Sequence, residues 1–250
     1  MADKHKFTTE VIDLPSGGKL YPQDSPLGSG KITIKYMTAR EEDILTSQNL
    51  IKKALVIEKL LDALIVTEDV KYQDLIVGDK NAVMIAARIL AYGPEYPTEI
   101  INPNTGDKIT HTFNLADCPF KKIPEGVTEN KFDIKLPISK ADISFKLLTG
   151  KEENLIDEEI KSIQKVNPQV VPELTTRLKH VITSVNGDTE QHTINNFVDN
   201  MLSRDSLHLR QEMKKNAPDI ELQQTIEIEG EEVRVDIPMT TNFFWPDSKI

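Results

Sequence analysis

The sequence predicts an α+β fold built from two diverged tandem repeats, each running from one or more strands through helices to a β-hairpin. Three observations predict it. Alternating apolar residues indicate strands at 31–36 and 143–147. A Thr followed three residues later by a Glu indicates a helix start directly after each strand. A glycine turn between alternating segments then indicates a hairpin near the end of each half. With 250 residues and 38% hydrophobic side chains, the chain is long enough to bury a core.

The first half opens in extended structure and then turns into a helix. Residues 7–21 alternate and reach a Pro-Ser-Gly-Gly run, which predicts an extended arm followed by a tight turn. Residues 31–36 place Ile and Tyr on one side and Lys and Thr on the other, the pattern of a half-buried strand. The Thr38 hydroxyl can cap a backbone amide while the Glu41 carboxylate reaches back, so we predict that a helix begins here.

Helices and a hairpin complete the first half. Apolar residues follow helical spacing over 51–65. A second apolar helix is opened by Asp79 and stopped at Gly93, because glycine readily adopts the conformation that ends a helix. Residues 97–115 predict a hairpin, with its turn at 103–106.

The same order of signals returns in the second half. Alternation at 132–136 and 143–147 predicts strands, and Thr149 with Glu152 repeats the capping box. Helical spacing then predicts helices at 155–163, 174–185, 194–202 and 205–218. A last hairpin is predicted at 224–237 around its glycine.

An internal duplication explains this repetition. Residues 32–38 align with residues 143–149 without a gap, at an offset of 111 (149 minus 38). Later in each half Asp79 falls opposite Asp205, at a larger offset, as expected if loops lengthened while strands and caps were kept. The alternative is that any two units of strand, helix and hairpin look alike at this level. The ungapped strand and capping box favour duplication.

Duplication predicts the domain bounds and bears on function. We predict a first repeat at 1–122, which includes the extended arm, and a second at 123–250, which includes an aromatic tail. A catalytic site in one copy has no need to survive in both, whereas a packing scaffold does. The residues that the copies share are apolar side chains, caps and turn glycines, so the pattern predicts a protein that is not an enzyme.

Charge and cysteine content narrow the class of protein. With 40 acidic against 30 basic residues, the formal net charge of −10 would repel a phosphate backbone, so we predict no nucleic-acid partner. The single cysteine, Cys118, excludes an intrachain disulfide. No apolar run reaches the roughly 18 to 20 residues that span a bilayer. Because residues 1–6 are also polar, we predict no membrane partner and no secretion by a signal peptide.

Each candidate reactive group has a simpler structural explanation. Residues 102–106 have the outline of a zinc-knuckle turn, but Asn102 and Thr105 stand where the thiolates would be, which favours an ordinary turn. Cys118 has no cysteine partner, and the acidic pairs stand in first turns of helices, where the helix dipole favours negative charge. The glycine turns lack the context of a phosphate loop. The sequence therefore predicts no catalytic, metal or cofactor-binding residue.

The tail is the strongest candidate for a binding site. Phe243, Phe244 and Trp245 are consecutive, and Trp245 is the only Trp of the chain. Aromatic residues dominate interface hot spots, so these three rings are predicted to anchor a partner. The alternative is that they fold back onto the last hairpin.

Three segments carry a resemblance to a known family. The run IKYMTAREEDILTSQNL at 34–50, with LPS at 14–16 and LIVGDKN at 75–81, resembles the baseplate hub subunit and hub assembly family of T-even-like contractile-tailed bacteriophages. The resemblance is most specific over 7–120, and the second half with its Phe-Phe-Trp-Pro ending looks like the same family's carboxy-terminal portion. Some relatives keep a Cys-Pro-x-Cys turn where this chain has 102–106, and that departure argues against a metal-binding role in this chain.

The resemblance implies a structural or assembly protein of the tail baseplate hub, located in the virion tail baseplate or in the host cytoplasm during assembly. Its implied partners are other tail or baseplate hub proteins, and several copies could assemble as an oligomer. The alternative is a tail-assembly chaperone that leaves before the virion matures. A decayed zinc or nucleic-acid-binding module is a third hypothesis, motivated only by the turn at 102–106.

Overall fold

The fold is α+β, as the sequence predicts. The computed structural model describes residues 7–52, 55–102, 105–169, 171–228, 230–239 and 243–245. In the first half the elements are β1 (Thr9–Asp13), the 3-10 turn η1 (Pro26–Ser29), β2 (Lys31–Lys35), α1 (Ala39–Leu45), α2 (Gln48–Lys52), α3 (Val56–Leu64), η2 (Tyr72–Asp74), α4 (Val77–Tyr92), β3 (Glu95–Ile101), β4 (Lys108–Asn114) and η3 (Leu115–Asp117).

The second half contains the three-stranded sheet and the last hairpin. Its elements are β5 (Phe120–Lys121), β6 (Phe132–Lys135), β7 (Asp142–Phe145), α5 (Gly150–Val166), α6 (Glu173–Val181), β8 (Ile182–Val185), α7 (Gln191–Asp199), α8 (Ser203–Asn216), β9 (Asp219–Ile220), β10 (Gln223–Ile228) and β11 (Glu231–Asp236). In the described parts of the chain, β6, β7 and β8 form a three-stranded sheet, and the other strands pair in twos as β1–β2, β3–β4, β5–β9 and β10–β11. All of these pairings are antiparallel.

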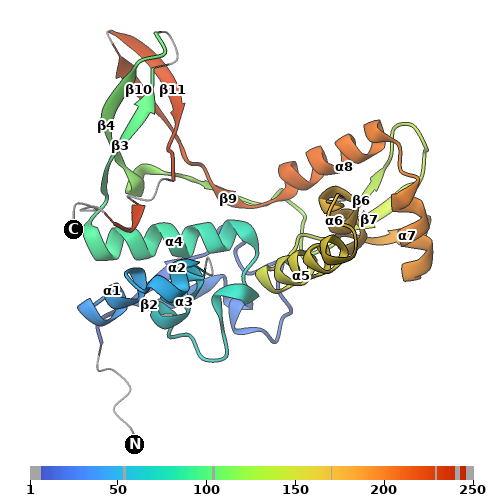
Figure 1. Cartoon of the computed structure of the whole chain (residues 1–250), viewed down its shortest axis with the longest axis horizontal. Coiled ribbons are helices and arrows are strands. Elements are labelled where there is room, and N and C mark those ends of the chain that lie inside the picture. The colour runs from blue at the N-terminus through green and yellow to red at the C-terminus, as the bar shows by residue number, and fades with distance from the viewer. Residues whose placement is uncertain are drawn as a thin grey trace, which may run out of the picture.

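Two hydrophobic cores divide the molecule into two lobes (Figure 1). The first lobe comprises β1–β4, α1–α4, the β10–β11 hairpin and residues 243–245, which share one core. The second lobe comprises β6–β8 and α5–α8 around the other core. The last hairpin therefore shares a core with the first half of the chain, across the boundary at residue 122 that the sequence predicts between two repeats.

The chain crosses between the lobes twice, and the two crossings lie side by side. The outward crossing contains β5, and the return crossing contains β9. Phe120 pairs with Ile220 and Lys121 with Asp219 in an antiparallel register. Figure 1 shows β9 running between the end of α8 and the base of the β10–β11 hairpin, alongside α4. The paired crossings fasten the two lobes to each other.

The predicted helix over 174–185 is wrong at its end. The α6 helix stops at Val181, and Ile182–Val185 form β8, the third strand of the second-lobe sheet. β-branched residues such as Ile182 and Thr183 favour strands. The turn that follows is formed by Asn186 and Gly187, both with positive φ (51° and 83°), a pair that is typical of tight turns beside strands.

The helical spacing over 51–65 does not correspond to a single helix either. Instead of one continuous helix after Thr38, the described chain forms the short helices α1 and α2 and then α3. Residues 53 and 54 lie outside the described residues. By contrast, α4 ends at Gly93 as predicted, and the strands of both predicted hairpins pair. Residues 103 and 104 of the first turn and residue 229 of the second lie outside the described residues.

Equivalent networks of hydrogen bonds cap the N-termini of α1 and α5. At α1 the Glu41 carboxylate accepts from the Thr38 amide (3.0 Å) and the Thr38 hydroxyl (2.6 Å) and pairs with Lys35 (2.8 Å). At α5 the Glu152 carboxylate accepts from the Thr149 amide (2.8 Å) and hydroxyl (3.1 Å) and pairs with Lys146. In each case the lysine lies six residues before the glutamate, on the preceding strand or directly after it.

The Glu41 network predicts a pH-dependent contribution to stability. Burial alone would raise the pKa of this carboxyl, but the bonds from Lys35 and Thr38 outweigh it and lower the pKa from 4.5 to about 2. Between those pH values the unfolded chain binds more protons than the folded chain, so the stabilisation is complete above about pH 4.5 and is lost as the pH falls towards 2. We expect Glu41→Gln to lower the free energy of unfolding by about 1–3 kcal/mol at pH 7.

The measurement is urea unfolding followed by circular dichroism at several pH values. The difference between Glu41→Gln and the unmodified protein should shrink as the pH falls below 4.5. Asp43→Asn is the matched control, because Asp43 is an exposed carboxylate in the same helix. A Glu41→Gln effect that stays constant from pH 7 to pH 2.5 would contradict this account.

Candidate functional site

In each lobe, a buried aspartate in the first turn of a long helix holds a turn of the preceding chain by hydrogen bonds. Asp79, the third residue of α4, is 0% exposed and accepts hydrogen bonds from the Ser16 amide (3.0 Å), the Ser16 hydroxyl (2.6 Å) and the Tyr21 hydroxyl (2.6 Å). The Tyr21 oxygen in turn accepts from the Ile76 amide (3.0 Å). Burial raises the pKa of Asp79, against these hydrogen bonds, which lower it. The carboxylate ties the turn after β1 to the start of α4.

The second lobe contains the corresponding contact. Asp205, the third residue of α8, is 0% exposed and accepts from the amides of Ile138 (2.8 Å) and Ser139 (2.9 Å) in the turn after β6. Burial would raise the pKa of this carboxyl, but the two amide hydrogen bonds outweigh it and lower the pKa. Both aspartates therefore accept hydrogen bonds from backbone amides of a turn in their own lobe.

Backbone contacts join the lobes where η2 leads into α4. The Gly150 amide donates to the Leu75 carbonyl (3.0 Å), and Ile76 bridges Thr149 in an antiparallel pair. Nearby, the Asn81 side chain donates to the Asp219 carboxylate (2.9 Å), which reaches from α4 to β9. These contacts place the start of α4 against both the start of α5 and β9.

A close approach of two backbones lies at the centre of this junction. A Cβ added at Gly78 would meet the Pro218 carbonyl oxygen at 1.9 Å and the Asp219 Cα at 2.9 Å. Only a residue without a side chain lets α4 lie this close to the segment between α8 and β9.

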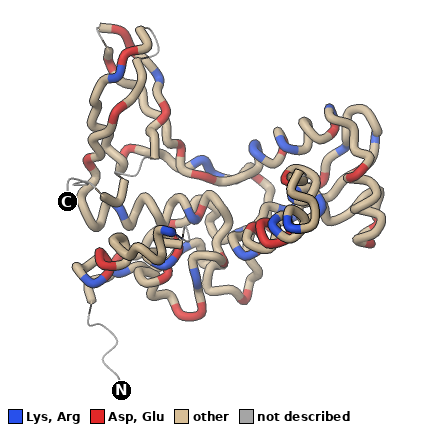
Figure 2. Tube along the Cα trace, in the orientation of Figure 1, with Lys and Arg blue, Asp and Glu red and all other residues tan. Residues whose placement is uncertain are grey.

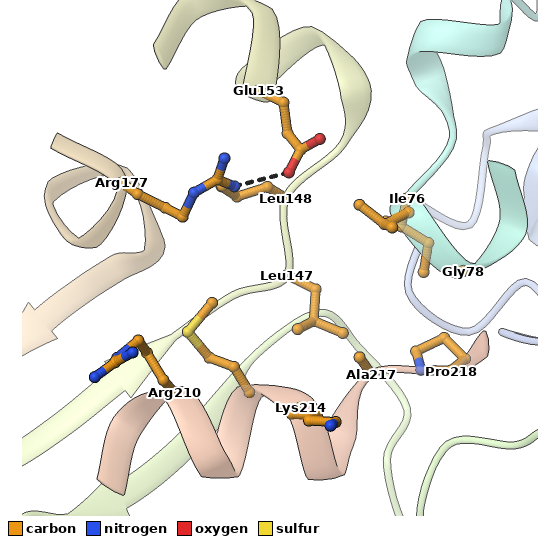
Figure 3. A pocket seen from close by; sticks show the side chains of 12 residues that line it. Ile76, Gly78, Leu147, Leu148, Glu153, Arg177, Arg210, Lys214, Ala217 and Pro218 are labelled. Carbon is orange, nitrogen blue, oxygen red and sulfur yellow. Dashed lines mark hydrogen bonds and ion pairs between the residues drawn. The ribbon is translucent and has the colours of Figure 1, made fainter. Parts of the chain in front are cut away.

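A pocket of about 260 Å³ opens beside this junction (Figure 3). Its walls come from the start of α4, the connection from β7 to α5, and the end of α8, and the apolar residues among them are Ile76, Val77, Leu147, Leu148, Met213, Ala217 and Pro218. Arg177 of α6 donates to Glu153 of α5 (2.8 Å), the ion pair drawn in Figure 3. Arg210 and Lys214 of α8 complete the lining.

The pocket is locally positive within an acidic chain. Its lining holds three basic side chains and one acidic side chain, whereas the whole chain has a formal net charge of −10. Figure 2 shows Lys and Arg positions along α8. The positive end of the α4 dipole also lies here, because Val77 and Gly78 are the first two residues of that helix. The pocket suits a group that is partly apolar and partly anionic.

The predicted tail anchors are mostly buried. Phe243 and Phe244 are 3% and 2% exposed, and Phe243 packs edge-to-face on Tyr96 of β3 with ring centroids 5.3 Å apart. Trp245 is half-buried, and its indole nitrogen donates to the Leu45 carbonyl at the end of α1 (3.2 Å). In this conformation Trp245 alone of the three presents appreciable surface to a partner. A partner-binding role for the three rings stays a prediction.

Trp245 is expected to stabilise the chain through its indole nitrogen. Trp245→Phe keeps an aromatic ring but removes the donor to the last carbonyl of α1, so we expect a loss of about 1 kcal/mol in the free energy of unfolding. Urea unfolding followed by circular dichroism measures this loss, with Val166→Ala, at a side chain that is 88% exposed, as the control. No change in Trp245→Phe would show that the Leu45 contact contributes nothing.

Cys118 and the turn at 102–106, the other groups considered in the sequence, contact the protein's own side chains and backbone. Cys118 is half-buried, burial raises the pKa of its thiol, and its sulfur lies 3.6 Å from the Gln224 side-chain nitrogen. In the turn at 102–106, the Gly106 amide donates to the Asn102 carbonyl (2.8 Å). Across the described residues, no group of three or more His, Cys, Asp or Glu is placed to hold a metal ion, and no helix is long and apolar enough to cross a membrane.

Sequence reasoning missed the basic lining of the pocket. Arg177, Arg210 and Lys214 lie on two helices that are distant in sequence, and each of them reads as an ordinary solvated charge. They come to one opening only in the folded chain, where α6 and α8 both border the pocket at the start of α4.

Comparisons with known proteins place the chain in a family. No curated protein and no solved structure matches it. A family model described as "T4 bacteriophage base plate protein" matches residues 6–245. That match spans both lobes, the pocket and the aromatic tail, and it agrees with the resemblance found in the sequence. The chain therefore belongs to the T4 bacteriophage base plate protein family.

Proposed function

We propose that this baseplate protein is a non-catalytic structural or assembly component of the tail hub that acts by binding other baseplate proteins. The observation that carries the proposal is that four buried or partly buried carboxylates bind the protein's own backbone. Asp79 and Asp205 hold backbone turns, and Glu41 and Glu152 hold the starts of helices. Groups that could serve in acid–base chemistry are thus committed to the architecture, which is what a scaffold requires.

We further propose that the architecture consists of two diverged copies, at 1–122 and 123–250. Several paired features support this. In each copy a hairpin is followed by a capped helix, and a later helix begins with a buried aspartate. The bounds of α3 and α6 also coincide at an offset of 117 (173 minus 56). In this proposal the hairpin of the second copy, β10–β11, packs into the first lobe.

Two lobes fastened at fixed orientation would present several surfaces to neighbouring subunits. The site of action in this proposal is the virion tail baseplate, with the host cytoplasm as the place of assembly. Binding surfaces fit the family better than a reaction does, because a baseplate is an assembly of many protein chains. Several copies of this chain would follow from the symmetry of such an assembly.

Removing the gene product from an infection tests the proposal. A phage with a nonsense codon early in the gene should yield filled heads but few complete tails, and supplying the protein from a plasmid should restore them. Electron microscopy of the lysate counts both particles. Normal tails without the protein would overturn the proposal.

The same infection separates a resident component from a transient chaperone. In this proposal the protein copurifies with finished tails, whereas a chaperone would be required for assembly and then be absent from them.

A further inference from the structure

We propose that the pocket between the lobes is the docking site for another baseplate protein, and that it takes a segment in which an apolar side chain stands close to an Asp or Glu. This inference rests on the proposed function, because it specifies the chemistry of the partner that the same protein binds. The partner segment is defined by two features of the pocket, its apolar floor and its basic rim.

The apolar floor fits one large side chain of a protein segment. Ile76, at the N-cap of α4, and Leu147, in the β7–α5 connection, line the space (Figure 3). Met213 of α8 also belongs to its lining. The volume of about 260 Å³ is below the roughly 300–1,000 Å³ of typical small-molecule sites. An aromatic or branched aliphatic side chain that enters such a space loses water contact on most of its surface, which is how interface anchors contribute binding energy.

The basic side chains at the edge of the pocket favour an acidic residue beside that apolar side chain in the partner segment. Arg210 and Lys214 are four residues apart on α8, so they project from the same face of the helix. Within the described part of the chain, neither side chain has an ion-pair partner. A carboxylate beside the anchored apolar residue would pair with one or both of them.

Other kinds of ligand would match either the apolar floor or the basic rim of the pocket, but not both. An inorganic anion would leave the apolar floor uncovered, and a nucleic acid would meet the repulsion of a chain with a net charge of −10. A purely apolar segment would contact only the floor and would leave the charges of Arg210 and Lys214 without a partner. A protein segment with adjacent apolar and acidic residues satisfies both features.

Photocrosslinking in assembled tails identifies the occupant. Val77 lines the pocket and is 45% exposed, so p-benzoylphenylalanine is introduced in its place in an infecting phage, with Leu155 as a control position outside the pocket lining. After irradiation of purified tails, mass spectrometry identifies the crosslinked peptide. We expect a peptide of another baseplate protein, captured at or next to an apolar residue that lies within three residues of an Asp or Glu.

Charge reversal then tests the basic rim. The double variant Arg210→Glu and Lys214→Glu should reduce the crosslink about tenfold. The control variant Arg204→Glu and Lys215→Glu makes the same charge change on exposed residues of the same helix outside the pocket, and it should change the crosslink less than about twofold. Replacing the partner's acidic residue by Lys should restore crosslinking in the first variant.

Each remaining outcome decides against the inference. A peptide without a nearby acidic residue, a crosslink to a second copy of this chain, equal losses in both charge variants, or no crosslink from tails that contain the protein would overturn it while leaving the proposed function standing. Absence of the protein from finished tails would instead overturn the proposal of a resident component, and this inference with it.

Discussion

Gly78→Ala is expected to lower the free energy of unfolding by about 3 kcal/mol or more. The added Cβ would lie 1.9 Å from the Pro218 carbonyl oxygen and 2.6 Å from its carbonyl carbon, both of them backbone atoms. Either α4 or the segment leading into β9 would have to move, and that segment is held by the β5–β9 pairing. Helix propensity alone predicts a gain of about 1 kcal/mol, so the expected effect has the opposite sign.

Gly150→Ala is the matched control for this prediction. Gly150 lies in the first turn of α5 at the same junction, but its added Cβ would meet first the Nζ end of Lys80, a flexible side chain that can move aside. The nearest backbone atom, the Gln73 Cα, lies 3.1 Å away, compared with 1.9 Å for the backbone atom nearest to Gly78. We expect a change below about 1 kcal/mol. Chemical unfolding measures both variants, and hydrogen exchange at the amides of Ala217, Asp219 and Ile220 should become faster only in Gly78→Ala. Equal effects of the two substitutions would contradict the close approach.

Asp79→Ala is expected to cost about 3–5 kcal/mol of unfolding free energy. The substitution leaves three donors without their acceptor, namely the Ser16 amide, the Ser16 hydroxyl and the Tyr21 hydroxyl, at a side chain that is 0% exposed. The effect should exceed that of Asp205→Ala, which orphans the two amides of Ile138 and Ser139.

Urea unfolding of the two aspartate variants measures this order. Asp157→Ala, at an exposed carboxylate of α5, should stay within about 0.5 kcal/mol of the unmodified protein. If Asp79→Ala behaved like Asp157→Ala, the turn after β1 would not depend on the buried carboxylate.

Local features of the fold could be predicted because their signals are close in sequence. Thr38 and Glu41 are three residues apart, and the same spacing recurs at Thr149 and Glu152, so each capping box is visible before any folding is considered. The lysines that pair with these glutamates were not anticipated, because strand and helix residues meet there through a turn.

Features that depend on distant contacts could not be predicted. From the sequence, Asp79 looks like an acidic residue in the first turn of a helix. Its partner Ser16 is 63 residues away, and nothing in either local pattern links the two. Gly78 looks like an unfavourable residue at the start of a helix until Pro218 is seen beside it. The aromatic tail was ambiguous for the same reason, because Tyr96, on which Phe243 packs, belongs to a hairpin more than a hundred residues earlier.

Quantitative mass spectrometry of purified tails tests the central claim most directly. A resident structural component should be present in finished tails at a constant ratio to the other baseplate proteins, and that ratio should survive further purification. Finding the protein abundant in infected cells but absent from finished tails would contradict the account and identify it as a protein that leaves during assembly.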